Sequence, residues 1–341
     1  MSKEYYNNRM DSDLQLDLLV VGAGPTGLAC AIEAGKAGLQ AVVVDKGCIV
    51  NSIYHYPTSM QFFTTSELLE IGGLPFPSIM PKASRQEALA YYRRAVTYFR
   101  LDVRQYEQVE SITATHPGFE VHSRAGGTPH RYRAQAVVIA TGYYDRPNML
   151  GVPGEDLPHV FHYFHEAHAF SGLRVAVIGG KNSAAITALD LYRHGAKVTI
   201  IHRHAELGSS IKYWVRPDIE NRLKAGEIEA RFCTAVREIR PGTVLTTGPE
   251  GEGEVAADFV FALTGYHPDF QFLRAAGVEL DANQRPACDP ATYESNVAGL
   301  YLAGVIVAGR NTSEIFIENG RFHGQVIAAH LLAQRAAARL G

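Results

Sequence analysis

Residues 18–45 read LLVVGAGPTGLACAIEAGKAGLQAVVVD, and this stretch decides the fold class. The apolar run Leu18–Val21 predicts a β-strand, and Leu28–Ala37 predicts a helix. Ala41–Val44 predicts a second strand, which ends in an acidic residue, Asp45. A strand, a helix and a second strand in this order predict a βαβ unit and a parallel sheet.

Three glycines join the first strand to the helix in the pattern Gly-x-Gly-x-x-Gly. The first permits a tight turn, the second lets the main chain approach a pyrophosphate, and the third lets helix and strand pack closely. The helix amino terminus offers unpaired N–H groups and a partial positive charge to the phosphates, and the acid is placed to bind a ribose diol. We predict a dinucleotide site at Gly22, Gly24, Pro25, Thr26, Gly27, Asp45 and Lys46; the alternative is a glycine-rich turn without a ligand.

The same pattern recurs later in the chain. Arg174–Ile178 predicts a strand, Gly179–Ala184 a turn, Ala185–Arg193 a helix and Lys197–Ile201 the next strand. Within the turn, Lys181 occupies the place of the second glycine, so this fingerprint is imperfect. A lysine fits there if its side chain points away from the phosphates or towards them.

The second unit differs most at the end of its second strand, where His202-Arg203-His204 replaces the acid. A carboxylate there would bind the ribose 2′-hydroxyl of NADH, whereas arginine suits the 2′-phosphate of NADPH. Lys212 could help to hold that phosphate, and a solvated side chain is the alternative for both cations. The predicted NADPH site is Gly179, Gly180, Lys181, Asn182, Ser183, Ala184, His202, Arg203 and Lys212.

Two further apolar strands end in Thr-Gly and bracket the second unit. Ala136–Ala140 leads into Thr141-Gly142, and Phe259–Leu263 leads into Thr264-Gly265. We interpret them as the two places where the chain crosses between two hinged domains. The sequence thus predicts an α/β protein with two Rossmann-like, three-layer domains, the second inserted into the first. The predicted parts are a flexible segment at 1–13, an FAD-binding domain at 14–148 and 266–341, and an NADPH-binding domain at 149–265.

The carboxy-terminal part continues the first domain. Leu300–Ala303 predicts a strand ending at Gly304, and a long helix is expected from about Ser313 to Arg339. In this architecture the helix amino terminus points at the flavin ring and favours negative charge on it. The order of the parts places FAD in the first site and the nicotinamide nucleotide in the second. The further FAD-binding candidates are Val109, Ala140, Thr141, Gly142, Gly304, Val305, Ile315 and Phe316.

These residues resemble the two-domain flavoprotein reductases of low-molecular-mass thioredoxin reductase type, and among them the bacillithiol disulfide reductase family. The resemblance implies an FAD enzyme that uses NADPH to reduce the disulfide form of bacillithiol, a small thiol, beside thiol-exchange proteins called bacilliredoxins. Lys181 and Val305 also match the family's own pattern. The matching segments are 51–58, 139–144, 160–164, 178–184, 265–269 and 315–324.

One departure from the family concerns a catalytic thiol. Family members carry a cysteine directly before the third glycine of the first fingerprint, and it has been proposed as the catalytic residue. Here that residue is Thr26, which cannot form a thiolate or a mixed disulfide. The family's thiol mechanism therefore does not carry over to this chain.

The four cysteines offer no clear replacement. Cys30 shares a helix face with Thr26 one turn further on, and a buried structural cysteine is the expectation, with a catalytic thiol as the alternative. Cys48, Cys233 and Cys288 are interpreted as structural or incidental. No cysteine occurs at 163–168, where the thioredoxin reductase dithiol would fall, so that chemistry is excluded.

Several histidines and one acid invite other roles. His159, His162, His165 and His168 recur every third residue, and on a helix they would fan over half its circumference, so no metal site is expected. His323 and Glu318 lie in the first turns of the last helix, near the expected flavin edge. Either could relay a proton to reduced flavin, or serve in capping or packing.

Bulk properties limit the classes of function. The chain has 341 residues and a net charge of −3, without the clustered cations that nucleic acids require. No apolar stretch reaches the roughly 20 residues of a membrane span. Scattered cysteines and a polar start indicate the cytoplasm. A homo-oligomer is expected, and the aromatic face of the helix Arg85–Arg100 is assigned to core packing, with a subunit interface as the alternative.

Two alternatives to the disulfide reductase are compatible with the same residues. An electron transferase feeding ferredoxin or flavodoxin, or a diaphorase, would keep both cofactors and need no thiol. A module that binds nucleotide and senses redox state would keep the fold without the catalysis. A flavin monooxygenase is disfavoured, because its Phe-x-Gly-x-x-x-His motif is not matched between the two cradles.

Overall fold

The computed structural model describes residues 15–340, so the segment expected to be flexible at 1–13 lies outside the description. The chain divides into two compact units, each described here by itself. Unit 1 contains residues 15–54, 61–145 and 267–340, and unit 2 contains His55–Met60 and Arg146–Tyr266.

A short segment of the chain belongs to a different unit from the one that its sequence position suggests. His55–Met60 lies in unit 2, although the sequence boundaries place it within the first domain. The amide of Thr58 donates to the carbonyl of His165 at 2.9 Å, and the Ser59 hydroxyl donates to Asp190 Oδ2 at 3.3 Å. These bonds between distant residues attach the segment to unit 2.

Unit 1 is built on a mixed sheet in which five strands run parallel. β1 pairs in parallel with β2 and β6, β2 with β3, and β6 with β15, whereas β4, β5 and β6 form an antiparallel meander. The strand order is β3-β2-β1-β6-β5-β4, with β15 beside β6. The strands are β1 (Gln15–Val21), β2 (Ala41–Val44), β3 (Asp102–Arg104), β4 (Glu107–Ala114), β5 (Phe119–Ala125), β6 (Thr128–Ile139) and β15 (Leu300–Leu302).

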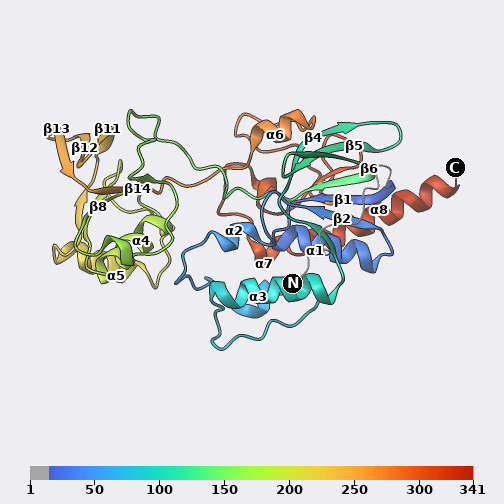
Figure 1. The fold of residues 1–341 in the computed structure, drawn as a ribbon, viewed down its shortest axis with the longest axis horizontal. Coiled ribbons are helices and arrows are strands. Elements are labelled where there is room, and N and C mark those ends of the chain that lie inside the picture. Colours follow the sequence, from blue (N-terminus) through green and yellow to red (C-terminus); the bar gives the residue numbers. More distant parts are fainter. Residues whose placement is uncertain (1–14, 341) are drawn as a thin grey trace. The chain divides into compact units, whose positions relative to one another are not determined.

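Helices α1 and α8 cover one face of this sheet, and α6 lies beside β4. α1 begins with Pro25 at its first turn, where a missing N–H is harmless, and packs against α8 along the sheet (Figure 1). In α3, the Ser84 hydroxyl and Glu87 form a capping box; Tyr91 and Tyr92 are buried as expected, but Tyr98 is 64% exposed. The helices of unit 1 are α1 (Pro25–Lys36), α2 (Asn51–Tyr54), η2 (Ser66–Leu69), α3 (Arg85–Tyr98), α6 (Phe270–Ala275), η4 (Gly304–Ala308), α7 (Ile317–Gly320) and α8 (His323–Leu340).

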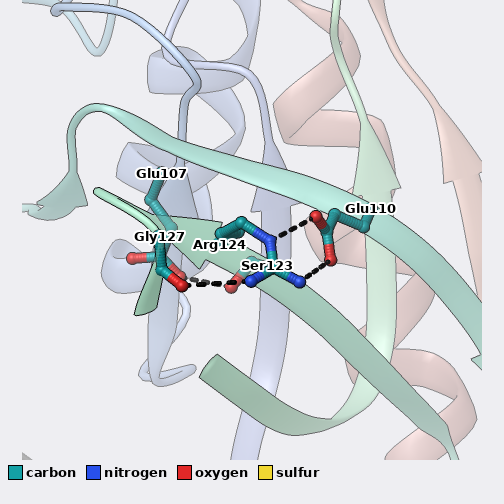
Figure 2. Close-up of polar contacts among 5 residues, drawn as sticks. All are labelled: Glu107, Glu110, Ser123, Arg124 and Gly127. Atoms are coloured by element: carbon teal, nitrogen blue, oxygen red, sulfur yellow. Dashed lines mark hydrogen bonds and ion pairs between the residues drawn. The ribbon is translucent and has the colours of Figure 1, made fainter. Parts of the chain in front are cut away.

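The meander β4–β5–β6 is joined by polar contacts (Figure 2). The Arg124 guanidinium donates to Glu110 at 2.8 Å and to the carbonyl of Gly127 at 3.0 Å. The buried Glu107 carboxylate accepts from the Ser123 hydroxyl and, at 2.7 Å, from Tyr132. A buried carboxylate with two hydroxyl donors is a satisfied structural group, and it ties the start of β4 to β5 and β6.

Unit 2 has three layers around a parallel sheet of order β10-β9-β8-β14-β7. Side chains of α4 and α5 form the core on one face, and the antiparallel sheet β11–β12–β13 covers the other. The elements are β7 (Val160–Phe161), η3 (His168–Phe170), β8 (Arg174–Ile178), α4 (Asn182–Arg193), β9 (Lys197–Ile201), α5 (Arg216–Lys224), β10 (Glu229–Arg231), β11 (Ala235–Arg240), β12 (Thr243–Gly248), β13 (Gly251–Ala256) and β14 (Phe259–Ala262). The predicted α/β fold class is confirmed.

The expectation of one long carboxy-terminal helix is wrong. Residues 313–316 are not helical, α7 ends at Gly320, and α8 begins only at His323. Tertiary contacts cause the break: the Arg321 guanidinium donates to the carbonyls of Glu67 (2.8 Å) and Glu70 (2.9 Å). The Asn319 amide also turns back and accepts from the amide of Phe316 at 2.7 Å.

The helix expected for the four spaced histidines is also absent from this part of the described chain. Val160–Phe161 forms an edge strand instead, paired with Val260–Phe261, and only His168 lies in a short 3-10 turn. The reason is that two consecutive apolar residues complete the sheet edge, which the three-residue spacing does not reveal.

Candidate functional site

The first predicted site gathers at one edge of the unit 1 sheet. Its residues follow the carboxyl ends of the parallel strands β1, β2, β6 and β15. This edge is where open α/β sheets bind ligands. The structure therefore brings together four segments that are widely separated in the sequence: 22–27, 45–46, 140–142 and 304–305.

The glycines of the first loop have the packing that the fingerprint requires. Gly22 has φ +110°, and a side chain there would overlap the carbonyl of Ala140. A Cβ atom on Gly27 would overlap the carbonyl oxygen of Gly22. Gly24, by contrast, has nothing within 4 Å of the position of its missing Cβ. The open space before the amino terminus of α1 fits a phosphate group, so these residues fit a bound dinucleotide.

The acid after β2 is tied to the glycine loop. Asp45 Oδ2 accepts from the amide of Ala23 at 2.6 Å, and Oδ1 accepts from Gly47 at 2.8 Å. Burial raises the pKa of this carboxyl, although both amide bonds oppose the shift. The next residue, Lys46, forms an ion pair with Asp145 at 3.0 Å. The carboxylate thus uses two of its four lone-pair directions, one to hold the glycine loop and one to hold the turn after β2.

Thr26, at the position of the family's thiol, packs against two main-chain segments. Cβ atoms placed on Gly304 and Gly320 would lie 3.2 Å and 3.1 Å from Thr26 Oγ1. The hydroxyl therefore lies between the turn after β15 and the end of α7. The other FAD candidates of this region are Val305, half-buried in η4, and Ile315 and Phe316, which precede α7.

The two proton-relay candidates have different surroundings. His323 is 4% exposed, and burial lowers the pKa of its imidazole to about 4. Its Nδ1 accepts from the amide of Gly304 at 3.1 Å, which requires a neutral ring at that nitrogen. Glu318 is half-buried in α7. The geometry of His323 is that of a structural acceptor, which agrees with the packing alternative.

The remaining candidates of unit 1 are placed by the sheet. Ala140 is buried and its amide donates to the carbonyl of Val21 at 2.8 Å. Thr141 and Gly142 follow, the latter with φ +71°. The Val109 side chain lies in the hydrophobic core of unit 1, beside a register shift in β4, so only its main chain could face a ligand.

The second predicted site gathers at the equivalent edge of the unit 2 sheet, after β8, β9 and β14. Gly179 has φ +144°, and a Cβ atom there would lie 3.1 Å from Ala184 Cβ. The His202 ring lies directly against Gly180, where a side chain would overlap it. Burial, His204 and Arg203 lower the pKa of His202, in that order of effect.

A loop that the fingerprint does not include closes over the start of α4. The Asn182 amide donates to the carbonyl of Ser210 at 2.9 Å and accepts from the amide of Lys212 at 3.0 Å. The amide of Gly208 donates to the carbonyl of Gly180 at 2.7 Å. These contacts bring Lys212 to the same edge as the exposed Lys181, Ser183 and Arg203. The sequence assigns Asn182 to the cofactor, and its link to 210–212 leaves no local sequence signal.

The cysteines are separated from this chemistry in different ways. Cys30 is 1% exposed beneath Gly324 of α8, and burial raises the pKa of its thiol to about 12, as expected for a structural residue. Burial also raises the thiol pKa of Cys48 and, to about 11, that of Cys288. Cys233 is exposed in unit 2, where its amide donates to the carbonyl of His204 at 2.9 Å.

The described residues contain neither a metal-binding cluster nor a membrane-spanning helix. Between residues 15 and 340, no three His, Cys, Asp or Glu side chains gather in a way that could hold a metal ion. No helix in that range combines the length and apolar character needed to cross a membrane.

Comparison with known proteins shows extensive similarity. Residues 19–304 match the pyridine nucleotide-disulphide oxidoreductase family. The chain is 46% identical to the bacilliredoxin reductase Bdr of Bacillus subtilis (strain 168), covering 93% of this chain and 98% of that protein. It is 43% identical to the solved bacillithiol disulfide reductase Bdr from Bacillus cereus, with a TM-score of 0.93 and coverage of 94% and 100%. The corresponding enzyme from Staphylococcus aureus gives 39% identity, a TM-score of 0.90 and coverage of 94% and 99%.

Proposed function

The chain belongs to the pyridine nucleotide-disulphide oxidoreductase family, and we propose that it reduces bacillithiol disulfide, or a bacilliredoxin disulfide, with NADPH through FAD. It is a flavin-dependent oxidoreductase with FAD and NAD(P)H as cofactors. The observation that carries the proposal is the pair of dinucleotide cradles, one at each parallel sheet edge, in a chain 46% identical to a bacilliredoxin reductase.

In unit 1 we assign the FAD site to the strand-end segments. The open space at Gly24 and the amino terminus of α1 would accept the pyrophosphate, and Asp45 would accept the ribose hydroxyls with its remaining lone pairs. The turn at Gly304 and Val305 would lie against the flavin half. Lys46, Val109, Ile315 and Phe316 complete this assignment, together with Pro25, Thr26 and the stretch 140–142.

In unit 2 we assign the NADPH site. Residues 179–184 would hold the pyrophosphate, and Arg203, exposed at the end of β9, would bind the 2′-phosphate. His202 packs on Gly180, and Lys212 is held at the same edge by Asn182. A basic segment in place of the acid favours NADPH over NADH.

The overall reaction consumes NADPH, one proton and one disulfide, and yields NADP⁺ and two thiols. Bound FAD would supply the chemistry of hydride transfer from the nicotinamide and of two-electron transfer to the disulfide. The chain's own residues bind and orient the two nucleotides. No residue is assigned as a catalytic thiol, because Thr26 lacks one and Cys30 is buried.

The partner is a small disulfide or a small redox protein. We propose the bacillithiol system, and ferredoxin or flavodoxin would be the partner of an electron transferase built on the same cofactors. We propose the cytoplasm, where bacillithiol would be kept reduced, as the location. We propose a homo-oligomer as the assembly, and size-exclusion chromatography with light scattering tests it.

Anaerobic turnover of the purified FAD-loaded protein tests the proposed function. With NADPH and bacillithiol disulfide, we expect NADPH oxidation matched by the release of two thiols for each NADPH. The same protein is assayed with ferredoxin and flavodoxin. Turnover with those carriers and none with the disulfide or a bacilliredoxin would contradict the proposal. A protein that binds FAD but whose flavin absorbance is not bleached by NADPH would indicate a redox sensor.

A further inference from the structure

We propose that His323 is a positioning residue for the flavin site, which fixes the turn at Gly304 as a hydrogen-bond acceptor and takes no part in proton transfer. This inference rests on the proposed FAD site in unit 1. It is carried by contacts among Gly304, Tyr293, Thr26 and the start of α8.

The first observation is a buried hydrogen bond between the main chain and an imidazole. The amide of Gly304 donates to His323 Nδ1 at 3.1 Å, and both residues are buried. Gly304 has φ +78°, a left-handed conformation that needs glycine and does not continue the strand. An amide at a buried turn must find an acceptor, because leaving it unpaired costs about 1–3 kcal/mol. His323 supplies that acceptor from a segment nineteen residues away.

The second observation is that another ring holds the imidazole in place. Tyr293 and His323 are stacked, with ring centroids 3.9 Å apart and planes 11° apart. Tyr293 itself has φ +60°, which costs a non-glycine residue about 1 kcal/mol or more. Its carbonyl accepts from the amide of Leu302 at 2.9 Å. The stacked pair therefore holds the main chain at two points. The Tyr293 carbonyl pairs with the amide of Leu302, the last residue of β15, and His323 Nδ1 pairs with the amide of Gly304.

The third observation connects this turn to the first glycine loop. A Cβ atom on Gly304 would lie 3.2 Å from Thr26 Oγ1, so the turn and the loop are already in close contact. A shift of Gly304 would therefore move against Thr26 or open a gap beside it. Since Thr26 lies in the loop assigned to FAD, the imidazole sets the distance between the two walls of that site.

The same geometry argues against a proton relay. Nδ1 must be unprotonated to accept from Gly304, and burial lowers the pKa of the imidazole to about 4. Protonation at this nitrogen would break the hydrogen bond. Near neutral pH the ring is therefore a fixed neutral acceptor.

Substitutions of His323 that differ only in the acceptor test the inference. His323→Asn keeps an oxygen acceptor close to the position of Nδ1, whereas His323→Leu removes it. His330→Leu is the matched control: His330 lies on the same helix and shares a partly buried hydrogen bond with the Tyr301 hydroxyl at 2.9 Å. The FAD affinity of each apoprotein is measured by fluorescence quenching. The visible circular dichroism of the bound flavin and the stability of the apoprotein are measured for the same variants.

We expect His323→Leu to weaken FAD binding about tenfold or more, as the loss of a buried hydrogen bond predicts, and to change the flavin dichroism. His323→Asn should stay within about threefold of the parent protein, and His330→Leu should lower stability without changing FAD affinity. Equal FAD binding by His323→Leu and the parent, or equal losses in His323→Asn and His323→Leu, would overturn the inference. A parent protein that binds no FAD would instead overturn the proposed function.

A second substitution keeps the test decisive if His323→Leu does not fold. Tyr293→Ala removes the stacking ring and leaves the Gly304 hydrogen bond in place. Weaker FAD binding by a folded Tyr293→Ala protein supports the role of the pair in positioning the turn. Unchanged FAD binding and dichroism in that protein would contradict it.

Discussion

The carboxylate of Asp45 accepts a hydrogen bond from the amide of Ala23 at 2.6 Å, so the end of β2 and the first glycine loop are directly linked. Twenty-two residues separate the two partners. An acid at this position thus has a second role besides binding a ribose, because it orders the loop that would receive the phosphates.

Removal of the Asp45 charge tests this link. We expect Asp45→Asn to weaken FAD binding by about 10–100-fold, because hydrogen bonds to a charged group contribute about 1.5–3 kcal/mol. FAD titration of the apoprotein provides the measurement. Glu110→Gln is the control, since Glu110 is an exposed partner of Arg124 in the meander. Equal FAD affinities of the Asp45 and Glu110 variants would refute the role.

Two alanine substitutions in the same loop should behave differently. Gly24→Ala places a methyl group in open space, so the apoprotein should keep its stability and lose FAD binding. Gly27→Ala would overlap the carbonyl of Gly22 and should destabilise the fold by about 2 kcal/mol or more. Denaturant unfolding and FAD titration separate the two effects. A Gly24→Ala protein that binds FAD normally would show that the phosphates lie elsewhere.

Replacement of Arg203 tests the choice of nicotinamide nucleotide. Arg203→Ala should raise the KM for NADPH about tenfold or more and leave the KM for NADH nearly unchanged, because only NADPH carries the 2′-phosphate. Lys197→Ala removes the same charge from the opposite end of β9 and serves as the control. A parallel rise of both KM values would remove Arg203 from the phosphate site.

Turnover should not depend on the chain's own thiols. We expect a protein with all four cysteines replaced by alanine or serine to keep its disulfide reductase rate within a few fold, provided that it folds. Treatment of the parent protein with N-ethylmaleimide should likewise leave turnover intact. Loss of turnover in either experiment, with FAD still bound, would indicate a thiol mechanism. Thr26→Cys then shows whether a thiol at the family's position increases the rate.

Acid should destabilise the protein through His323. The folded pKa is about 4 against an ordinary value of 6.5, so the fold favours the neutral ring. The contribution of the neutral His323 ring to the free energy of unfolding is fully present above pH 6.5 and is lost as the pH falls from there towards about 4. Between pH 6.5 and 5 the loss is about 1.5 kcal/mol. Denaturation of the apoprotein at several pH values measures the free energy of unfolding. The loss should appear in the parent and in the control His122→Asn, which changes an exposed histidine, and it should be absent in His323→Asn.

Local patterns predicted the two cradles well. The predicted bounds of β2, β8 and β9 agree with the structure, because strand periodicity and glycine spacing act between neighbours in the chain. The predicted α1 was short at its start, where Pro25 begins the helix inside the fingerprint. These elements carry most of the evidence for two nucleotide sites.

Patterns failed where distant contacts override local preference. The three-residue histidine spacing indicated a helix, but Val160–Phe161 completes a sheet edge by pairing with residues a hundred positions later. The final helix was predicted without a break, but Arg321 turns towards carbonyls more than two hundred and fifty residues earlier. Neither partner is visible in a local window.

The sequence by itself determined the α/β class, the two fingerprints and the exchange of an acid for a basic segment, because each depends on residues close together in the chain. Only the tertiary structure decided that Thr26 lies against Gly304 and Gly320, that Tyr293 stacks on His323, and that His55–Met60 belongs to unit 2. Such contacts depend on how packed elements approach one another, and packing is a property of the whole fold.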